Sequence, residues 1–172
     1  MSDDFLQTAI DLFNQGDIDG AIEYLESKLS DNPDNAQVHH MYAEFANMKN
    51  SEAQEDVIPG RKIMMMYKKA MDLDEENMEY IADFAAFALE CRRIPVAVKE
   101  FQRYARRLEL EDIPVDEILF TASRNIVDAI EVMDPSKNNP IVQPWLQQAL
   151  IWAVGGLGYS KDEAVEMITR EI

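Results

Sequence analysis

Hydrophobic side chains recur at helical spacing along most of this 172-residue chain, and turn-forming residues separate the runs. The first run places four apolar residues at positions i, i+4, i+7 and i+8, the spacing of one helical face: Phe5, Ala9, Leu12 and Phe13. Gly16 follows, and glycine is the residue that most often stands just past a helix end. The pattern predicts an N-terminal amphipathic helix that stops before Gly16.

A second helical face follows this glycine, with Asp17 placed to cap its first turn. Its apolar members are Ile18, Ala21, Ile22, Leu25 and Leu29. The run ends at "SDNPDN", where Pro33 cannot continue a helix and the flanking Asp and Asn residues favour turns. The two helices predict a hairpin of about 34 residues, a length typical of helical repeat proteins.

The same period returns twice before residue 112. "AQVHHMYAEFANMKN" and "KIMMMYKKAMDLDEEN" predict a second hairpin, with "SEAQEDVIPG" as an insertion near residues 50–60. "MEYIADFAAFALECRRIPVAVKEFQRYARRLELE" predicts a third. Residues 1–111 are therefore expected to form three helical hairpins, each burying its apolar face against the next.

The first hairpin carries a resemblance to a known family. "QGDIDGAIEYLESKLSDNPDN" resembles a tetratricopeptide repeat (TPR), and "YKKAMDLDEEN" resembles the end of another. The sequence departs from the family at Lys28, which replaces a small residue, and at Arg92 and Arg93, which stand where a turn glycine is usual. The resemblance covers about residues 2–111. It implies an all-α protein that forms a right-handed α–α superhelix, a TPR-like solenoid, with the first helices of the hairpins lining a concave surface.

Residues 112–172 follow the repeat pattern less closely. "VDEILFTASRNIVDAIEVM" and "PIVQPWLQQALIWAV" predict a degenerate fourth helical pair, and "SKDEAVEMITREI" predicts a capping helix that opens with a capping box of Ser160 and Glu163. "LGYSKDEAVEMI", within residues 145–171, resembles the helical hairpin of ubiquitin-associated and RuvA-type C-terminal domains. That resemblance implies an alternative function as a nucleic-acid or ubiquitin-system adaptor.

The net charge of −17 narrows the range of partners. It is distributed as −11 over residues 1–60, zero over 61–111 and −6 over 112–172. A field of this sign repels nucleic-acid phosphates and anionic lipid, so it disfavours nucleic acid and membranes and favours basic or neutral protein partners. The alternative interpretation is that the charge only keeps the protein soluble. The start "MSDDFLQ" has no signal-peptide pattern and no apolar run is long enough to span a bilayer, so we expect a cytoplasmic protein.

The concave surface implied by the TPR resemblance is the first candidate for a site. The residues beside the packing faces of the first helices are Asp3, Leu6, Ile10 and Phe13; His40, Met41, Glu44 and Asn47; and Glu79, Asp83, Ala86 and Glu90. Apolar groups and carboxylates together suit a basic or amphipathic protein segment or peptide. We therefore expect a protein-interaction scaffold. The alternative interpretation is that neighbours bury the apolar residues and the acids only solvate a face.

Catalytic and metal-binding patterns are sparse. No phosphate-binding glycine loop, nucleophile elbow or paired-cysteine motif occurs, so we expect neither enzyme activity nor a cofactor. His40 and Glu44 are spaced i, i+4, but no third ligand is evident, so we expect no metal, and we expect His39 to pack between helices. The single Cys91 rules out an internal disulfide and is expected to be a small buried residue, although the arginines after it would also suit a reactive thiol.

Two other surfaces are predicted, one basic and one apolar. Lys99, Arg103, Arg106 and Arg107 form a basic stripe at i, i+4, i+7 and i+8. This stripe is suited to dock an acidic partner, or phosphate in the manner of nucleic-acid binders. The simpler interpretation is that it pairs with Glu100, Glu109 and the acidic neighbouring repeats. The apolar C-terminal helices around Trp145 and Trp152 suggest self-assembly into a homo-oligomer as a further alternative.

Overall fold

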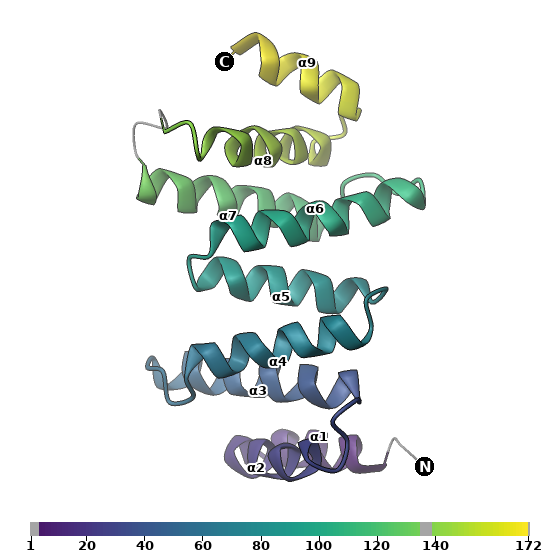
Figure 1. The fold of residues 1–172 in the computed structure, drawn as a ribbon, viewed down its shortest axis with the longest axis vertical. Helices are drawn as coiled ribbons and strands as arrows, with labels where there is room; N and C mark the ends of the chain where they lie inside the picture. The colour runs from purple at the N-terminus through teal and green to yellow at the C-terminus, as the bar shows by residue number, and fades with distance from the viewer. Residues whose placement is uncertain (1–3, 135–138, 172) are drawn as a thin grey trace. The chain divides into compact units, whose positions relative to one another are not determined.

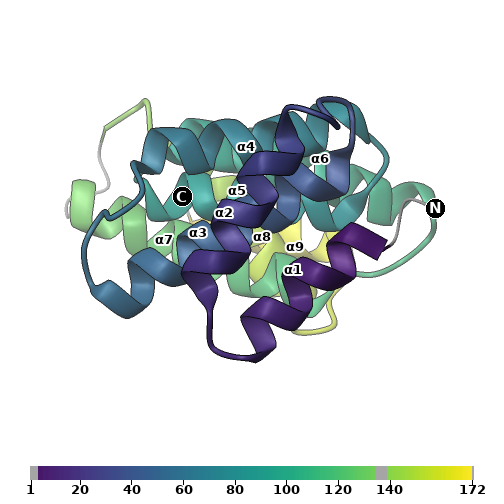
Figure 2. The same cartoon turned by 90° about the horizontal axis from the view of Figure 1, so that it is seen from below.

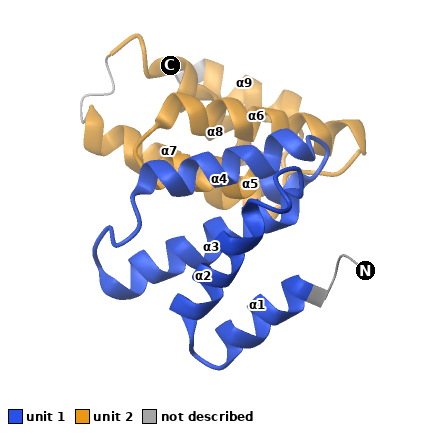
Figure 3. Ribbon diagram, turned by 60° about the horizontal axis from the view of Figure 1, so that its bottom comes forward, with its two compact units in different colours: residues 1–80 blue, residues 81–172 orange. Residues whose placement is uncertain are grey.

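The computed structural model describes residues 4–134 and 139–171, and within these ranges the chain forms nine α-helices and no β-strand (Figure 1, and from below in Figure 2). The predicted all-α fold class is confirmed. The chain divides into two compact units, residues 1–80 and 81–172, which Figure 3 colours separately. Each unit is described below by itself.

The first unit contains four complete helices: α1 (Asp4–Asn14), α2 (Ile18–Leu29), α3 (Ala36–Ala53) and α4 (Gly60–Leu73). Each of these helices packs against the next one along the chain. Leu25, Tyr42 and Ile63 are fully buried in the core. His39 is also buried, and its Nε2 donates a hydrogen bond of 2.9 Å to the Pro33 carbonyl before α3 while its Nδ1 lies 3.4 Å from the Met66 sulfur of α4. The prediction that His39 packs between helices is confirmed.

Local sequence signals begin and end these helices. Gly16 adopts a φ of +82° between α1 and α2, in the left-handed region that glycine enters without steric cost. The Asp17 carboxylate accepts a hydrogen bond of 2.9 Å from the Gly20 N–H, and the Asn35 side chain accepts bonds from the first turn of α3. These caps satisfy backbone N–H groups that have no partner inside a helix, so the predicted helix starts are fixed by side chains.

The predicted insertion near residues 50–60 is partly helix and partly loop. α3 continues to Ala53, Gln54 ends it in the left-handed conformation, and a short loop leads to α4. The Asn50 side chain donates to the Ile58 carbonyl at 2.7 Å and accepts from the Ile58 N–H at 2.8 Å. This reciprocal pair of hydrogen bonds closes the base of the loop.

The second unit contains most of α5 (Met78–Glu90) together with α6 (Ile94–Leu110), α7 (Glu117–Met133), α8 (Gln143–Gly156) and α9 (Lys161–Glu171). α7 packs against both α6 and α8, and α9 packs against α8. Leu119, Ile126 and Ile130 of α7 are fully buried and form the centre of this core. Among the described residues, every helix is too short or too polar to traverse a bilayer.

The turn between α5 and α6 forms without a glycine. Arg92 takes a φ of +57°, the conformation that the absent glycine would adopt easily. Its N–H donates to the Leu89 carbonyl and the Arg93 N–H donates to the Ala88 carbonyl, both at 2.8 Å, so these two carbonyls in the last turn of α5 are satisfied. Cys91 is exposed. The prediction that Cys91 is buried is wrong, because the residue lies in this solvent-facing turn and not within the helix.

The predicted capping box at the start of α9 is present. The hydroxyl and the backbone N–H of Ser160 donate to Glu163 Oε2 at 2.7 and 2.8 Å, and the Glu163 N–H donates to Ser160 Oγ at 3.3 Å. The bonds from the Ser160 hydroxyl and N–H lower the pKa of Glu163. The pKa of Glu163 is lower in the folded chain than in the unfolded one. The contribution of the ionised carboxylate to folding stability is therefore fully present at pH values above the unfolded pKa. It is lost as the pH falls through the folded pKa.

We expect acidification from about pH 6 to about pH 2 to release this cap before it disturbs the buried core of the unit. The amide proton resonance of Ser160 should shift with the titration of Glu163 in NMR spectra, together with those of the first turn of α9. Glu163→Gln keeps a hydrogen-bond acceptor but removes the titrating charge, so the shift should be absent in that variant. A shift that persists in Glu163→Gln would contradict the assignment.

Candidate functional site

A groove in the second unit is the first candidate site. It has a volume of about 870 Å³, and its lining comes from α5 between Ala82 and Glu90, from α7 between Glu117 and Met133, and from Arg92, Ile94 and Phe101. We call it the α5–α7 groove. Its volume lies within the range of about 300–1,000 Å³ that is usual for ligand sites, so it can take up a substantial group.

The floor of the α5–α7 groove is apolar and buried. Phe101 of α6 is 2% exposed, Ile94 3% and Ala122 4%. These three side chains give the groove a solvent-excluded apolar part of its lining.

The wall formed by α7 presents large apolar side chains to solvent. Ile118 is 49% exposed, Val132 71% and Met133 54%. Single exposed apolar residues are common on proteins, but here three of them border one groove. Their burial by a partner would be favourable at about 25 cal/mol per Å² of apolar surface removed from water.

Carboxylates stand among these apolar groups. Asp83 and Glu90 belong to α5, and Glu117 and Asp128 belong to α7. Arg92 is the one basic residue among the described lining residues. The groove therefore carries a negative potential that attracts cationic groups. Its described lining includes Thr121 and Asn125 as neutral polar residues but neither histidine nor cysteine, a composition suited to binding.

Three of the residues that the sequence placed on a concave surface lie on this groove: Asp83, Ala86 and Glu90. The α7 residues were missed. Their signal was nevertheless present in the sequence, as a stripe at alternating spacings of four and three: Ile118, Ala122, Asn125, Ala129 and Val132. This stripe runs beside the buried one through Ile126 and Ile130, and only tertiary packing shows which of the two faces the core.

The candidate residues of the first unit are differently placed. Leu6 of α1 is 4% exposed, while Ile10 and Phe13 are half-buried. The Phe13 ring stacks on Phe45, with ring centroids 4.6 Å apart and planes 9° from parallel. These apolar groups therefore contribute to packing in the first unit, and Asp3 lies outside the described residues.

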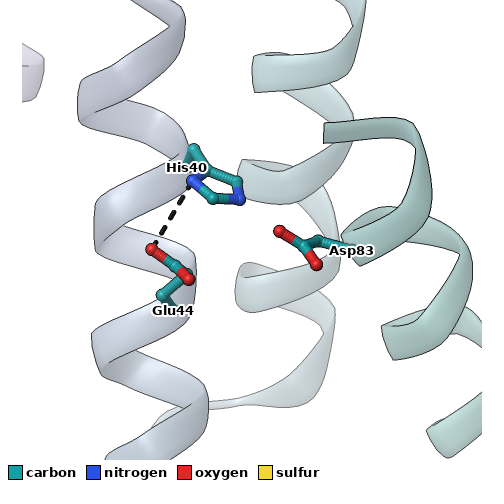
Figure 4. Close-up of side chains that lie close together, drawn as sticks. All are labelled: His40, Glu44 and Asp83. Atoms are coloured by element: carbon teal, nitrogen blue, oxygen red, sulfur yellow. Dashed lines mark ion pairs between the residues drawn. The ribbon is translucent and has the colours of Figure 1, made fainter. Parts of the chain in front are cut away.

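The candidate residues of α3 centre on His40. Its ring is buried and its centroid lies 4.5 Å from that of the Tyr80 ring. Its Nδ1 lies 3.5 Å from Glu44 Oε2, the ion pair that Figure 4 marks with a dashed line. Met41 is also buried, whereas Glu44 is half-buried. Burial, followed by the carboxylates of Asp74, Glu79 and Glu44, raises the pKa of Tyr80.

Asn47 and Glu79 complete the candidate set of the first unit. Asn47 of α3 is half-buried and Glu79 is exposed. With Glu44, they give the first unit a polar candidate surface, because its apolar candidates are largely packed.

The basic stripe on α6 is partly neutralised within the unit. Glu100 is 6% exposed and lies 3.6 Å from Lys99 Nζ and 3.8 Å from Arg103 Nη1. Pairing with Glu100, the simpler of the two interpretations, is therefore observed. Glu109 bonds instead to Lys161 at the start of α9, at 2.6 Å.

No protein-family model matches this sequence, and no curated protein is significantly similar to it.

Proposed function

We propose that this chain is a protein-interaction scaffold that binds a basic, amphipathic segment of a partner protein in the α5–α7 groove. The observation that carries the proposal is the exposed apolar wall of Ile118, Val132 and Met133 next to four carboxylates. Burial of the wall supplies affinity, and the carboxylates select a segment with lysine or arginine beside its apolar anchors.

The walls of the groove favour a helical partner segment. Backbone N–H and C=O groups within α5 and α7 are used in their own helices, so an extended peptide would find few groups to pair with its main chain. Thr121 and Asn125 are the neutral polar side chains of the described lining. A bound helix satisfies its own backbone and needs to offer only one apolar face, as in other helix-in-groove complexes.

We also propose that the helices form a TPR-like array with the right-handed superhelical arrangement of a solenoid. The support is the recurring hairpin period of the sequence and the packing of successive helices from α1 to α4 and from α6 to α9. Under this proposal α5 and α7 are first helices of consecutive repeats, and the groove is part of their shared concave surface.

Affinity capture with matched variants tests the groove. Val132→Asp places a charge on the exposed wall and should weaken binding at least tenfold, about 1.4 kcal/mol. The variant should still fold, because the Val132 side chain is already 71% exposed. Val165→Asp makes the same change at an exposed valine of α9 outside the groove and should leave binding unchanged. Proteins that are recovered with the wild type and with Val165→Asp, but not with Val132→Asp, are partners of the groove. Equal recovery with all three chains would contradict the proposal.

Charge reversal tests the selection of a basic segment. Asp128→Lys should weaken binding of the captured partner by about tenfold at about 50 mM salt and by less at about 300 mM, because salt screens the interaction. Glu111→Lys changes the net charge equally at an exposed position outside the groove. If both reversals weaken binding to the same degree, the attraction belongs to the overall charge and not to the groove.

Self-assembly through the C-terminal helices is the second candidate function. Trp152 is 4% exposed and thus packs inside the unit, but Leu157, Tyr159 and Met167 are 69%, 47% and 45% exposed. These apolar groups would be available to another copy of the chain. A monomer mass that stays constant with concentration in sedimentation experiments would remove this candidate.

A further inference from the structure

A second cavity lies at the C-terminal side of the second unit. It has a volume of about 580 Å³ and is lined by the end of α6, the connection to α7, α8 and the start of α9. It shares no lining residue with the α5–α7 groove. We call it the C-terminal cavity, and the inference below is independent of the function proposed for the groove.

Two glycines shape this cavity. A Cβ atom at Gly155 of α8 would come within 2.8 Å of Val115 Cγ2, so the absence of a side chain lets the helix approach the α6–α7 connection closely. Gly158 takes a φ of +95° and turns the chain into α9. The turn brings Lys161 within 2.6 Å of Glu109 on α6, and this ion pair links the two helices that flank the cavity.

The interior of the C-terminal cavity is apolar. Leu108, Leu119 and Trp152 line it and are each less than 5% exposed. A volume of this size, with apolar walls and a few polar groups, is typical of a site for a small molecule. The indole of Trp152 also provides a spectroscopic reporter inside the cavity.

The charged groups of the lining are mostly acidic. Glu109 is paired with Lys161, and Glu163 accepts both bonds from Ser160. Asp112 is exposed, and its side chain makes no hydrogen bond or ion pair with the described residues. One carboxylate beside an apolar cavity thus remains without a cation.

We propose that the C-terminal cavity binds a small amphiphilic amine, with its alkyl or aryl part beside Trp152 and its ammonium group at Asp112. The apolar interior accepts the hydrocarbon, and the carboxylate favours a cation over a neutral or anionic head group. The ligand class is therefore defined by two parts, an apolar body that fits the cavity and one positive charge at its end.

Three probes with the same eight-carbon chain test this proposal: n-octylamine, n-octanol and n-octanoate, titrated at about pH 7, where the amine is charged and the acid is ionised. Trp145→Phe leaves Trp152 as the single tryptophan, so its fluorescence reports occupancy of the cavity. We expect octylamine to bind about tenfold more tightly than octanol and octanoate to bind most weakly. If Trp145→Phe does not fold, the wild-type chain serves, because Trp145 does not line the cavity.

Asp112→Asn tests the position of the ammonium group. Asp112 has a φ of +55°, a conformation that asparagine tolerates well, so the variant should fold. It should reduce octylamine affinity to that of octanol and leave octanol binding unchanged. Glu111→Gln removes the neighbouring charge outside the cavity and should change neither affinity. Equal binding of the three probes, no fluorescence response, or an amine preference that survives Asp112→Asn would overturn the proposal.

Discussion

Replacing Phe101 with alanine is expected to lower the free energy of unfolding of the second unit by about 3–5 kcal/mol. The ring is 2% exposed at the floor of the α5–α7 groove, so its removal loses buried apolar surface and leaves a cavity below the opening. Urea denaturation followed by tryptophan fluorescence measures the change. Both tryptophans of the chain, Trp145 and Trp152, lie on α8 and report on this unit.

Leu110→Ala on the same helix is the matched control. Leu110 is 74% exposed, so its truncation should change the free energy of unfolding by no more than about 0.5 kcal/mol. A similar loss of stability in both variants would indicate that α6 is sensitive to any truncation, and the assignment of Phe101 as a core residue would be wrong.

Replacing Asp116 with alanine is expected to lower the free energy of unfolding of the second unit by about 2–4 kcal/mol, the second large effect. Asp116 Oδ1 accepts a hydrogen bond of 2.8 Å from the Leu119 N–H and so caps α7. Its Oδ2 accepts a 2.5 Å bond from the Tyr104 hydroxyl, which ties α7 to α6. The alanine variant loses the cap, worth about 1 kcal/mol, and leaves the hydroxyl of a largely buried tyrosine without its partner, at about 1–3 kcal/mol.

Two further variants separate these contributions. Tyr104→Phe removes the hydroxyl but keeps the cap, so it should cost only about 1 kcal/mol, and Asp116→Asn retains an acceptor for the cap and should also cost less than the alanine change. Burial and the Asp116 carboxylate raise the pKa of Tyr104, so its hydroxyl stays protonated and able to donate to Asp116 well into the alkaline range. If Asp116→Ala costs no more than Tyr104→Phe, the cap contributes nothing and the interpretation fails.

The helices of this protein were largely predictable because their ends are encoded locally. Gly16, Asp17 and the Ser160–Glu163 pair act through the backbone within one turn, and each acts in the structure as the sequence predicts. The turn at Arg92 was not predictable from local sequence. Arg92 adopts the glycine-like conformation at a modest local cost, and the turn that it forms is held by the Arg92 and Arg93 N–H bonds to the Leu89 and Ala88 carbonyls.

The candidate site was less predictable, because burial depends on partners that are distant in the sequence. Asp83 and Glu90 follow from their place beside a helical packing face, and both line the groove. Ile118 and Val132 belong to the second apolar stripe of α7, and sequence alone does not show which stripe is covered. Glu100 was expected to pair with the basic stripe, and it does, but its burial to 6% exposure between Lys99 and Arg103 depends on packing that the sequence does not show.

The reciprocal bonds between Asn50 and Ile58 have a practical consequence for the capture experiments. Residues 54–57 form an exposed arc of the loop between Asn50 and Ile58. A peptide inserted into these residues would leave both hydrogen bonds in place. A nick in the same arc would leave the ends of α3 and α4 held together by Asn50. The loop is therefore an attachment point at which the chain can be tethered to a solid support without altering a residue of the groove or of the C-terminal cavity.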